Sequence, residues 1–336
     1  MDSVAFELSG PKVSRLSELG QLGLDVPKGF AVTTAAFREC LAASGLERKL
    51  RRLEEATRIG DADRVAKLSS EMRQLVQTVD IPEALVSEIG RAHDWLGREV
   101  GKPDPRLAVR SSATGEDAAD KSFAGQYESY LGVTGLADLT QAVRDCWASL
   151  FNERAVDYRN RAGRSFVHSP MAVGVVELIE AEAAGVAFSL DPVTGHRDRV
   201  VVESTWGFGE ALVQGLISPD RVKVDKEATR VIDRHTGDKL QISVFDSSRS
   251  RVIETAMPPD KRARPSIDDT LAQRIGGIVR DLEKSVGAPV DVEWVAERRE
   301  GAAARLVFVQ MRPISTIAPE PELPRWRADK IAESWR

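Results

Sequence analysis

One short run constrains this chain more than any other: residues 107–117, with the sequence Leu-Ala-Val-Arg-Ser-Ser-Ala-Thr-Gly-Glu-Asp. Its apolar start predicts a short strand that delivers one cation, Arg110. Two serines and a threonine come next, followed by a loop of small residues. A fixed guanidinium beside hydroxyl and backbone N–H donors is typical of a phosphate-binding site. The run is neither a Walker A loop nor a dinucleotide-binding glycine fingerprint, because neither spacing precedes a helix here.

The composition is that of a soluble globular protein with room for two lobes or domains. The chain has 336 residues, of which 42% are hydrophobic and 29% charged. Its net charge of −5 gives no reason to expect nucleic acid as a partner. The acidic N-terminus lacks the apolar core of a signal peptide, and no run of about 18 apolar residues predicts a membrane span. We therefore expect a cytoplasmic protein that binds neither nucleic acid nor membrane.

Cysteine usage agrees with a reducing compartment. Cys40 and Cys146 are the two cysteines of the chain, and they are far apart in the sequence. Two thiols are too few for a disulfide framework or a zinc site. We expect both to be buried or half-buried free thiols.

Apolar periodicity predicts an alternation of helices and strands. In chain order we expect a loop, a short helix and a strand (4–35), helices (36–100), a strand (106–110), a helix (137–162), an amphipathic helix (268–286) and two closing strands (290–295 and 306–310). The two apolar runs at 171–180 and 185–190 are predicted to form a β-hairpin, because only a short segment separates them. A change in composition suggests three regions, 1–170, 171–315 and a tail at 316–336 that contains proline and tryptophan.

Five sequence blocks, taken together, identify a family. In order they are residues 10–12 with 26–30, the Arg110 run with 122–126, residues 185–195, residues 203–210 with 218–220, and residues 291–294 with 310–313. Over roughly residues 8–315 they resemble the ATP-binding domain of the phosphoenolpyruvate synthase and pyruvate phosphate dikinase family. The resemblance implies an α+β, ATP-grasp fold with two lobes, a nucleotide between them, and ATP with Mg²⁺ as cofactors.

The resemblance assigns three cations to the phosphates of ATP. It implies that Lys12 reaches the triphosphate, that Arg110 clamps phosphate oxygens and that Arg312 brings a further cation nearby. Phosphoryl transfer needs such groups to hold the phosphates in line and to neutralise developing charge. Gly125 and Gln126 fall in a loop that is similar to the family's phosphate lid, where glycine lets backbone N–H groups approach an anion. From the residues alone, Lys12 also fits an exposed loop lysine, and the lid loop also fits a plain hairpin turn.

Two further residues are similar to the family's Mg²⁺ ligands, Glu293 and Gln310. Mg²⁺ bound to a nucleotide takes one or two oxygen ligands from protein, and both side chains offer oxygen. Alternation along a strand places Asp291 and Glu293 on one face, and Arg312 shares the face of Gln310. A salt-bridge cluster on edge strands is the alternative that the residues alone leave open.

The adenine pocket is expected at residues 175–179, which are similar to the family's hinge strand. The resemblance implies contacts from Glu177 and from the Ile179 backbone to the adenine edge, within apolar walls. It also implies that Glu203 faces the ribose or phosphates. From the residues alone, a plain core strand fits 175–179 almost as well.

The chain departs from the family at its lysine loop. The family usually has two glycines before the lysine, whereas this chain has glycine at position 10 and Pro11. Proline fixes φ and removes an N–H, so one backbone contact to phosphate is in question. A longer hairpin loop is also expected between Glu293 and Gln310.

The chain lacks the family's carrier histidine. Family enzymes use ATP to phosphorylate a histidine in a glycine-rich T-x-H-A-type motif, which yields AMP and phosphate, and none of the four histidines here fits that motif. We therefore expect a separate subunit that carries the phosphohistidine domain, with the tail at 316–336 as linker or docking segment. Such split systems resemble phenylphosphate synthase and the two-component enzymes that phosphorylate 4-alkylphenols, so the expected small-molecule acceptor, bound elsewhere, is an aromatic alcohol or phenol.

Three other functions stay open at this point. A self-sufficient ATP-grasp kinase or ligase would give ADP and would need an acceptor pocket in this chain. A non-catalytic nucleotide sensor is disfavoured because the charged site residues are all present. An excised ATP-binding domain of phosphoenolpyruvate synthase or of a rifampicin phosphotransferase would need its missing domains on the same polypeptide.

Overall fold

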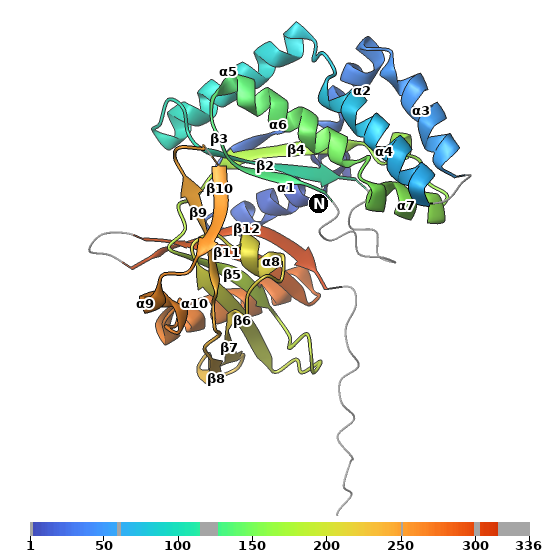
Figure 1. Cartoon of the computed structure of the whole chain (residues 1–336). Coiled ribbons are helices and arrows are strands. Elements are labelled where there is room, and N and C mark those ends of the chain that lie inside the picture. The colour runs from blue at the N-terminus through green and yellow to red at the C-terminus, as the bar shows by residue number, and fades with distance from the viewer. Residues whose placement is uncertain (1–2, 59–61, 115–126, 250, 299–302, 315–336) are drawn as a thin grey trace, which may run out of the picture.

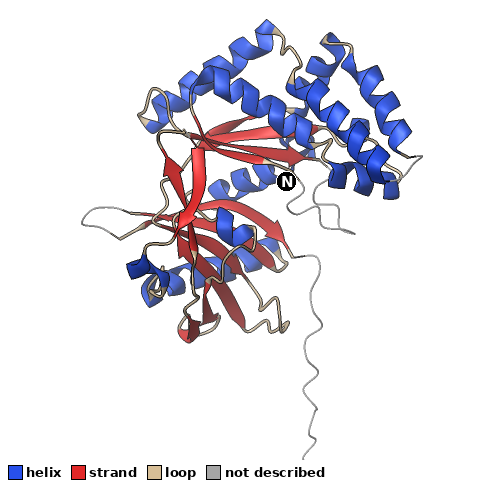
Figure 2. Ribbon diagram, viewed as in Figure 1, coloured by secondary structure: helices blue, strands red, loops and turns tan. Residues whose placement is uncertain are grey.

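The computed structural model describes residues 3–58, 62–114, 127–249, 251–298 and 303–314. Figures 1 and 2 show two sheets, one above the other in this view. Most helices lie above the upper sheet, on the side that faces away from the lower sheet. Helices and antiparallel strands come in separate runs rather than in strict alternation. The α+β class expected from the sequence is therefore confirmed. No described helix is long and apolar enough to cross a membrane.

The upper sheet has four strands in the order β1-β4-β2-β3, and all neighbours are antiparallel. The strands are β1 (Gly29–Val32), β2 (Leu107–Ala113), β3 (Ser129–Val133) and β4 (Met171–Glu177). One face is covered by α2 (Thr34–Ala43), α3 (Leu46–Thr57), α4 (Ala62–Gln77), α5 (Glu83–Val100), α6 (Gly135–Ser149) and α7 (Glu153–Arg161) (Figure 1).

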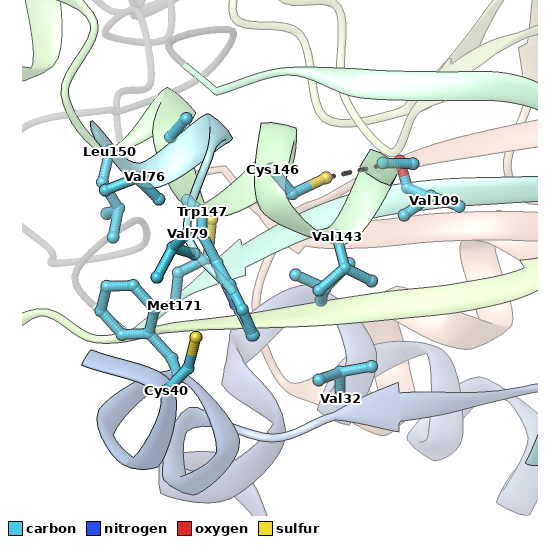
Figure 3. Packing of buried hydrophobic residues seen from close by; sticks show 14 of the residues in the cluster. Val32, Cys40, Val76, Val79, Val109, Val143, Cys146, Trp147, Leu150 and Met171 are labelled. Carbon is cyan, nitrogen blue, oxygen red and sulfur yellow. Dashed lines mark hydrogen bonds between the residues drawn. The ribbon is translucent and has the colours of Figure 1, made fainter. Parts of the chain in front are cut away.

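The core between these helices and the upper sheet is large and continuous. Trp147 is fully buried, and its ring centroid lies 5.5 Å from that of Phe37. Figure 3 shows Cys146 of α6 beside strand residue Val109, whose carbonyl accepts a hydrogen bond from the Cys146 thiol. Both cysteines are free and buried, as the sequence predicts.

The lower sheet has six strands in the order β12-β11-β5-β6-β7-β8. They are β5 (Ala183–Phe188), β6 (Arg199–Trp206), β7 (Asp220–Asp225), β8 (Val231–His235), β11 (Val290–Glu297) and β12 (Arg305–Pro313). Helix α10 (Asp269–Val286) packs on one face, over buried residues that include Trp294 and Phe308. The opposite face of the lower sheet is turned toward the upper sheet.

Helix α1 (Ser3–Gln21) lies between the two sheets and contacts β2, β4 and β12. The sequence predicts a loop before a short helix here, but the structure is helical on both sides of a break at Gly10, where φ is 71° and ψ is 170°. Pro11 is the first residue after the break. Proline suits the first position of a helix, where its missing N–H would have had no intrahelical partner.

A two-stranded ribbon joins the sheets along one side. It consists of β9 (Gln241–Asp246) and β10 (Arg251–Ala256); β9 contacts α8 (Glu210–Val213), and β10 contacts β3. Phe245 packs against Gly132, where an added Cβ would lie 2.4 Å from the ring. The Arg106 guanidinium lies 4.1 Å from the centre of the same ring. The remaining elements are η1 (Phe166–His168) and α9 (Pro259–Arg262).

Two expectations about the middle of the chain are wrong. The predicted hairpin of 171–180 with 185–190 does not form, because β4 pairs with β1 and β2 whereas β5 pairs with β11 and β6. The strand that begins at Met171, β4, is a central strand of the upper sheet. The chain passes from one sheet to the other at residues 178–182. The predicted helix at 137–162 is two helices, α6 and α7. The tail at 316–336 lies outside the described residues.

Candidate functional site

A cavity of about 500 Å³ lies between the two sheets and draws its walls from both. The upper sheet contributes residues of β2, β3 and β4, and the lower sheet contributes residues of β5, β11 and β12. The segment at 177–179, where the chain crosses between sheets, also lines it. The site residues predicted from the sequence that line this cavity are Arg110, Glu177, Ile179 and Glu293.

Part of the cavity is an apolar slot. Its upper wall is formed by Ala108 together with Leu131 and Val176, the residues directly opposite it on the two neighbouring strands. Its lower wall includes Ala184 and Val295, which also oppose one another. These pairs face the cavity because strand residues alternate between the faces of a sheet. The slot can therefore take a flat apolar group such as a purine base.

The next cavity-facing residue along β2 is Arg110, and it makes this end of the cavity polar. Its Nη1 donates to the Val309 carbonyl at 2.9 Å, and its Nη2 donates to Glu293 Oε2 at 2.9 Å and Gln310 Oε1 at 3.1 Å. All three acceptors belong to the lower sheet. The guanidinium therefore bridges the two sheets at the edge of the apolar slot.

Glu293 and Gln310 face one another across β11 and β12. Gln310 Nε2 donates to Glu293 Oε1 at 2.9 Å, and both side chains are largely buried. The structure thus brings together the two side chains predicted to bind Mg²⁺ and the arginine predicted to bind phosphate. Their oxygens fit the donor type that Mg²⁺ prefers. Among the described residues no group of three or more His, Cys, Asp and Glu side chains gathers as a metal cage.

Two strand positions further along, Asp291 and Arg312 form a second pair on the same face. Arg312 Nε donates to Asp291 Oδ2 at 2.7 Å. Burial raises the pKa of Asp291 above its usual value, and the charge of Arg312 opposes that rise. Alternation therefore predicts the common face correctly, but Arg312 does not line the cavity and reaches Asp291 instead.

Lys12 is held beside the polar end by contacts of its backbone. Its N–H donates to Ser112 Oγ at 3.2 Å, and the N–H of Val13 reaches the same oxygen at 3.4 Å. Ser112 lies two residues beyond Arg110 on β2 and so shares its face. The N–H groups of Lys12 and Val13 therefore attach this start of the helix to the sheet, although Pro11 has no N–H of its own.

The hinge residues line the cavity as expected. Ile179 is buried and packs with Ala184 and Val295. The Glu177 carboxylate accepts from the Lys28 N–H at 3.1 Å, and the Glu177 N–H donates to the Lys28 carbonyl at 2.8 Å. These bonds fix the segment that leads from the upper to the lower sheet.

Glu203 shares a sheet face with Glu293, because Val186 of β5 lies opposite both residues. It lies on β6, and its Oε1 accepts two hydrogen bonds from the Arg221 guanidinium at 2.9 and 2.6 Å. It does not line the cavity. Gly125 and Gln126, the predicted phosphate lid, lie outside the described residues.

Sequence reasoning missed two acidic residues that line the cavity: Glu128, which is paired with Arg73, and Glu210. Glu210 is the first residue of α8, and its Oε2 is buried with no hydrogen-bond partner among the described residues. Burial raises its pKa to about 7; the nearby charge of Arg110 lowers it, and that of Glu293 raises it. The sequence does contain a signal for it. Glu210 follows two glycines, Gly207 and Gly209, in the block 203–210, which resembles the family as a block without a role for this residue.

Fold and cavity together define a protein with an apolar slot that leads to a cluster of cationic and acidic side chains. The chain belongs to the family of the pyruvate phosphate dikinase AMP/ATP-binding domain, because the family profile matches residues 6–330. The recognition of this family from five sequence blocks is thereby confirmed, and ATP binding is the family's shared property.

Curated relatives support the same assignment. The chain is 34% identical over 312 residues to a probable phosphoenolpyruvate synthase of Methanocaldococcus jannaschii, covering 93% of this chain and 26% of the relative. It is 35% identical to the phosphoenolpyruvate synthase of Pseudomonas aeruginosa, covering 89% of this chain and 38% of the relative. It is 32% identical to the rifampicin phosphotransferase of Bacillus subtilis, with 96% and 36% covered. The chain thus spans between about a quarter and two fifths of the length of these relatives.

Proposed function

We propose that this chain is the ATP-binding component of a dikinase-type phosphotransferase and that its two sheets are the lobes of an ATP-grasp. ATP and water give AMP and phosphate, while the remaining phosphoryl group of ATP is transferred to a histidine outside this chain, which passes it to a small acceptor. Family membership supports ATP and the phosphotransferase class. The remaining steps are our proposal.

The observation that carries the proposal is the change in chemistry along one cavity. Apolar residues of both sheets form the slot, and Arg110 and Glu293 follow on the next cavity-facing positions, where both are hydrogen-bonded to Gln310. ATP has the same order, with a flat base at one end and a charged triphosphate at the other. Adenine fits the slot at Ile179 and Glu177, and the phosphates fit the Arg110 end.

Each cation has a distinct role in this proposal. The planar guanidinium of Arg110 on β2 binds two phosphate oxygens at once, whereas the ammonium of Lys12 on α1 acts as a point charge. Arg312, held by Asp291, adds positive potential beyond Gln310. Glu293 and Gln310 would hold Mg²⁺, which supplies charge neutralisation at the phosphates when bound. These groups would hold the phosphates in line and neutralise their charge.

The proposed histidine carrier is a separate domain or subunit. The chain's histidines are His93, His168, His196 and His235, and none of them lines the cavity. His93 is buried on α5, where its Nε2 lies 3.3 Å from Asp104 Oδ1, and His235 lies on the outermost strand β8. The partial coverage of the relatives is consistent with further domains in this protein family.

The acceptor is proposed from the split systems that the sequence resembles, namely an aromatic alcohol or phenol. The names of the relatives supply two other classes, pyruvate chemistry in phosphoenolpyruvate synthase and the antibiotic in rifampicin phosphotransferase. All three acceptor classes are compatible with this proposal, because the role proposed for this chain is complete once the histidine is phosphorylated.

Product analysis tests the proposal. The purified chain is incubated with Mg²⁺ and ATP labelled at either the α- or the γ-phosphate, alone and then with a phosphohistidine domain from its genomic neighbourhood or from a relative. We expect AMP and phosphate with that domain and no turnover without it. Arg110→Ala should abolish the products, whereas Arg161→Ala, which removes an exposed arginine of α7, should leave them unchanged. ADP formed by the chain alone with a small acceptor would instead establish a self-sufficient kinase.

A further inference from the structure

Glu210 lies where the apolar slot meets the charged end of the cavity. It follows Gly209, whose backbone rests against the lower wall of the slot: an added Cβ there would lie 3.6 Å from the Ala184 Cβ. Arg110 and Glu293, the residues of the charged end, are among the charges that act on the Glu210 carboxyl. The side chain therefore reaches from the slot toward the phosphate end.

The carboxyl of Glu210 is available to a ligand. Oε2 is buried and has no hydrogen-bond partner among the described residues, although the side chain lines the cavity. Buried polar atoms in native proteins are almost always paired, and an exception calls for an explanation. A donor brought by the ligand is the explanation that the cavity itself offers.

Short contacts hold the start of α8 in place. The Ala211 N–H donates to Ser243 Oγ at 3.2 Å, and the Phe208 N–H donates to the Ser243 carbonyl at 3.0 Å. Gly207 has φ of 72°, and an added Cβ there would lie 2.4 Å from the same carbonyl oxygen. The ribbon β9–β10 thus fixes the backbone on both sides of Glu210. A carboxyl on so constrained a backbone can discriminate between ligands by position.

We propose that Glu210 accepts hydrogen bonds from the ribose hydroxyls of the nucleotide and makes the site selective for ribonucleotides over deoxyribonucleotides. The inference rests on the proposed function, in which the base occupies the slot and the phosphates lie at Arg110. The sugar then lies between them, beside Glu210. Of the three parts of ATP, the ribose presents two adjacent O–H donors, and a carboxylate can accept from both. Glu203, for which the resemblance implies contact with the ribose or phosphates, is paired with Arg221 and does not line the cavity.

Binding of sugar-modified nucleotides tests this inference. Dissociation constants for ATP, 2′-deoxyATP and 3′-deoxyATP are measured with Mg²⁺ for the unmodified chain and for the variants Glu210→Ala, Glu210→Gln and Glu254→Gln. Glu254 is the matched control, because it is a nearby exposed acid on β10 that does not line the cavity, and because the amide oxygen of glutamine can still accept its hydrogen bond from Ser243 Oγ. Thermal unfolding of each variant checks that the chain is folded.

We expect the unmodified chain and Glu254→Gln to prefer ATP over at least one deoxy analogue by about ten- to hundredfold, the usual effect of a hydrogen bond to a charged group. Glu210→Ala should bind all three nucleotides alike, with its affinity for the deoxy analogues unchanged. Glu210→Gln should keep a smaller preference. The inference is overturned if the unmodified chain does not discriminate, or if Glu210→Ala weakens all three nucleotides equally, as loss of a metal ligand would. Failure of the unmodified chain to bind ATP at all would refute the proposed function itself.

Discussion

Replacing Gly10 by alanine tests how the break in α1 places Lys12. Gly10 has φ of 71°, and an added Cβ would lie 2.1 Å from the Ser112 carbonyl oxygen and 2.4 Å from its Oγ. Neither oxygen belongs to the end of a long flexible side chain, so the helix must move away from β2. That movement breaks the bond from the Lys12 N–H to Ser112 Oγ and carries the lysine with it.

Gly23 offers a matched control in the turn that follows the same helix. It has φ of 82°, but an added Cβ there meets nothing within 4 Å. Gly23→Ala should therefore cost only the strain of a left-handed alanine, about 1–2 kcal/mol of unfolding free energy. Gly10→Ala should cost about 1–3 kcal/mol of backbone strain, because φ of 71° with ψ of 170° is open essentially to glycine alone, plus about 1–3 kcal/mol for overpacking, or roughly 2–6 kcal/mol in all.

The two variants are compared by urea unfolding and by titration with Mg·ATP. We expect Gly10→Ala to lose about tenfold or more in ATP affinity, as expected when a charged contact is displaced. Gly23→Ala should bind ATP as the unmodified chain does. Equal losses of stability in both variants, or normal ATP affinity in a folded Gly10→Ala protein, would refute the reasoning that the close approach of Gly10 to β2 positions Lys12.

Three further outcomes follow from buried groups. Lys239→Met should lose about 3–5 kcal/mol in urea unfolding, because it removes the only buried counter-charge that the described residues place on Asp220, whose carboxylate is buried with it and keeps only hydrogen bonds from Gly237 and Ser266. Iodoacetamide at pH 8 should leave Cys40 and Cys146 unlabelled until the protein is unfolded, since burial raises the pKa of Cys40 to about 11 and raises that of Cys146 further. Burial raises the pKa of Glu210 to about 7 in the folded state. The folded chain therefore binds this proton more tightly than the unfolded chain, and stability should fall by about 1–3 kcal/mol as pH rises from about 4.5 to 7. Glu210→Gln should lack that fall when unfolding free energies at pH 5 and pH 8 are compared.

Local periodicity predicts the parts of the site that lie on strands. The run at 107–117 contains a strand that carries Arg110, and the alternation of Asp291 and Glu293 places both on one face with Gln310 and Arg312 opposite them. These inferences need only the two-residue repeat of a strand, which neighbouring structure does not alter. The roles of these residues toward ATP and Mg²⁺ stay predictions.

Sequence periodicity does not predict which distant strands pair with one another. β4 and β5 are both short, apolar and almost adjacent in the sequence, which is also the pattern of a hairpin. Their partners come from residues 29–32, 107–113, 199–206 and 290–297, so their assignment to different sheets depends on the whole chain. Glu210 escaped notice for a related reason, because a helix of four residues has no periodic signal.

The three bonds of Arg110 make metal and nucleotide binding interdependent. Its guanidinium donates to Glu293 and Gln310, the same oxygens that are proposed to hold Mg²⁺. A divalent cation needs the lone pairs that Arg110 occupies, and it is repelled by the guanidinium while those bonds last. Phosphate oxygens can draw Arg110 away, since they offer it the same charge-assisted bonds. Mg²⁺ and triphosphate should therefore bind together far better than either alone. Lysine at position 110 could not make this exchange in the same way, because one ammonium cannot reproduce the planar fork that meets two oxygens at once.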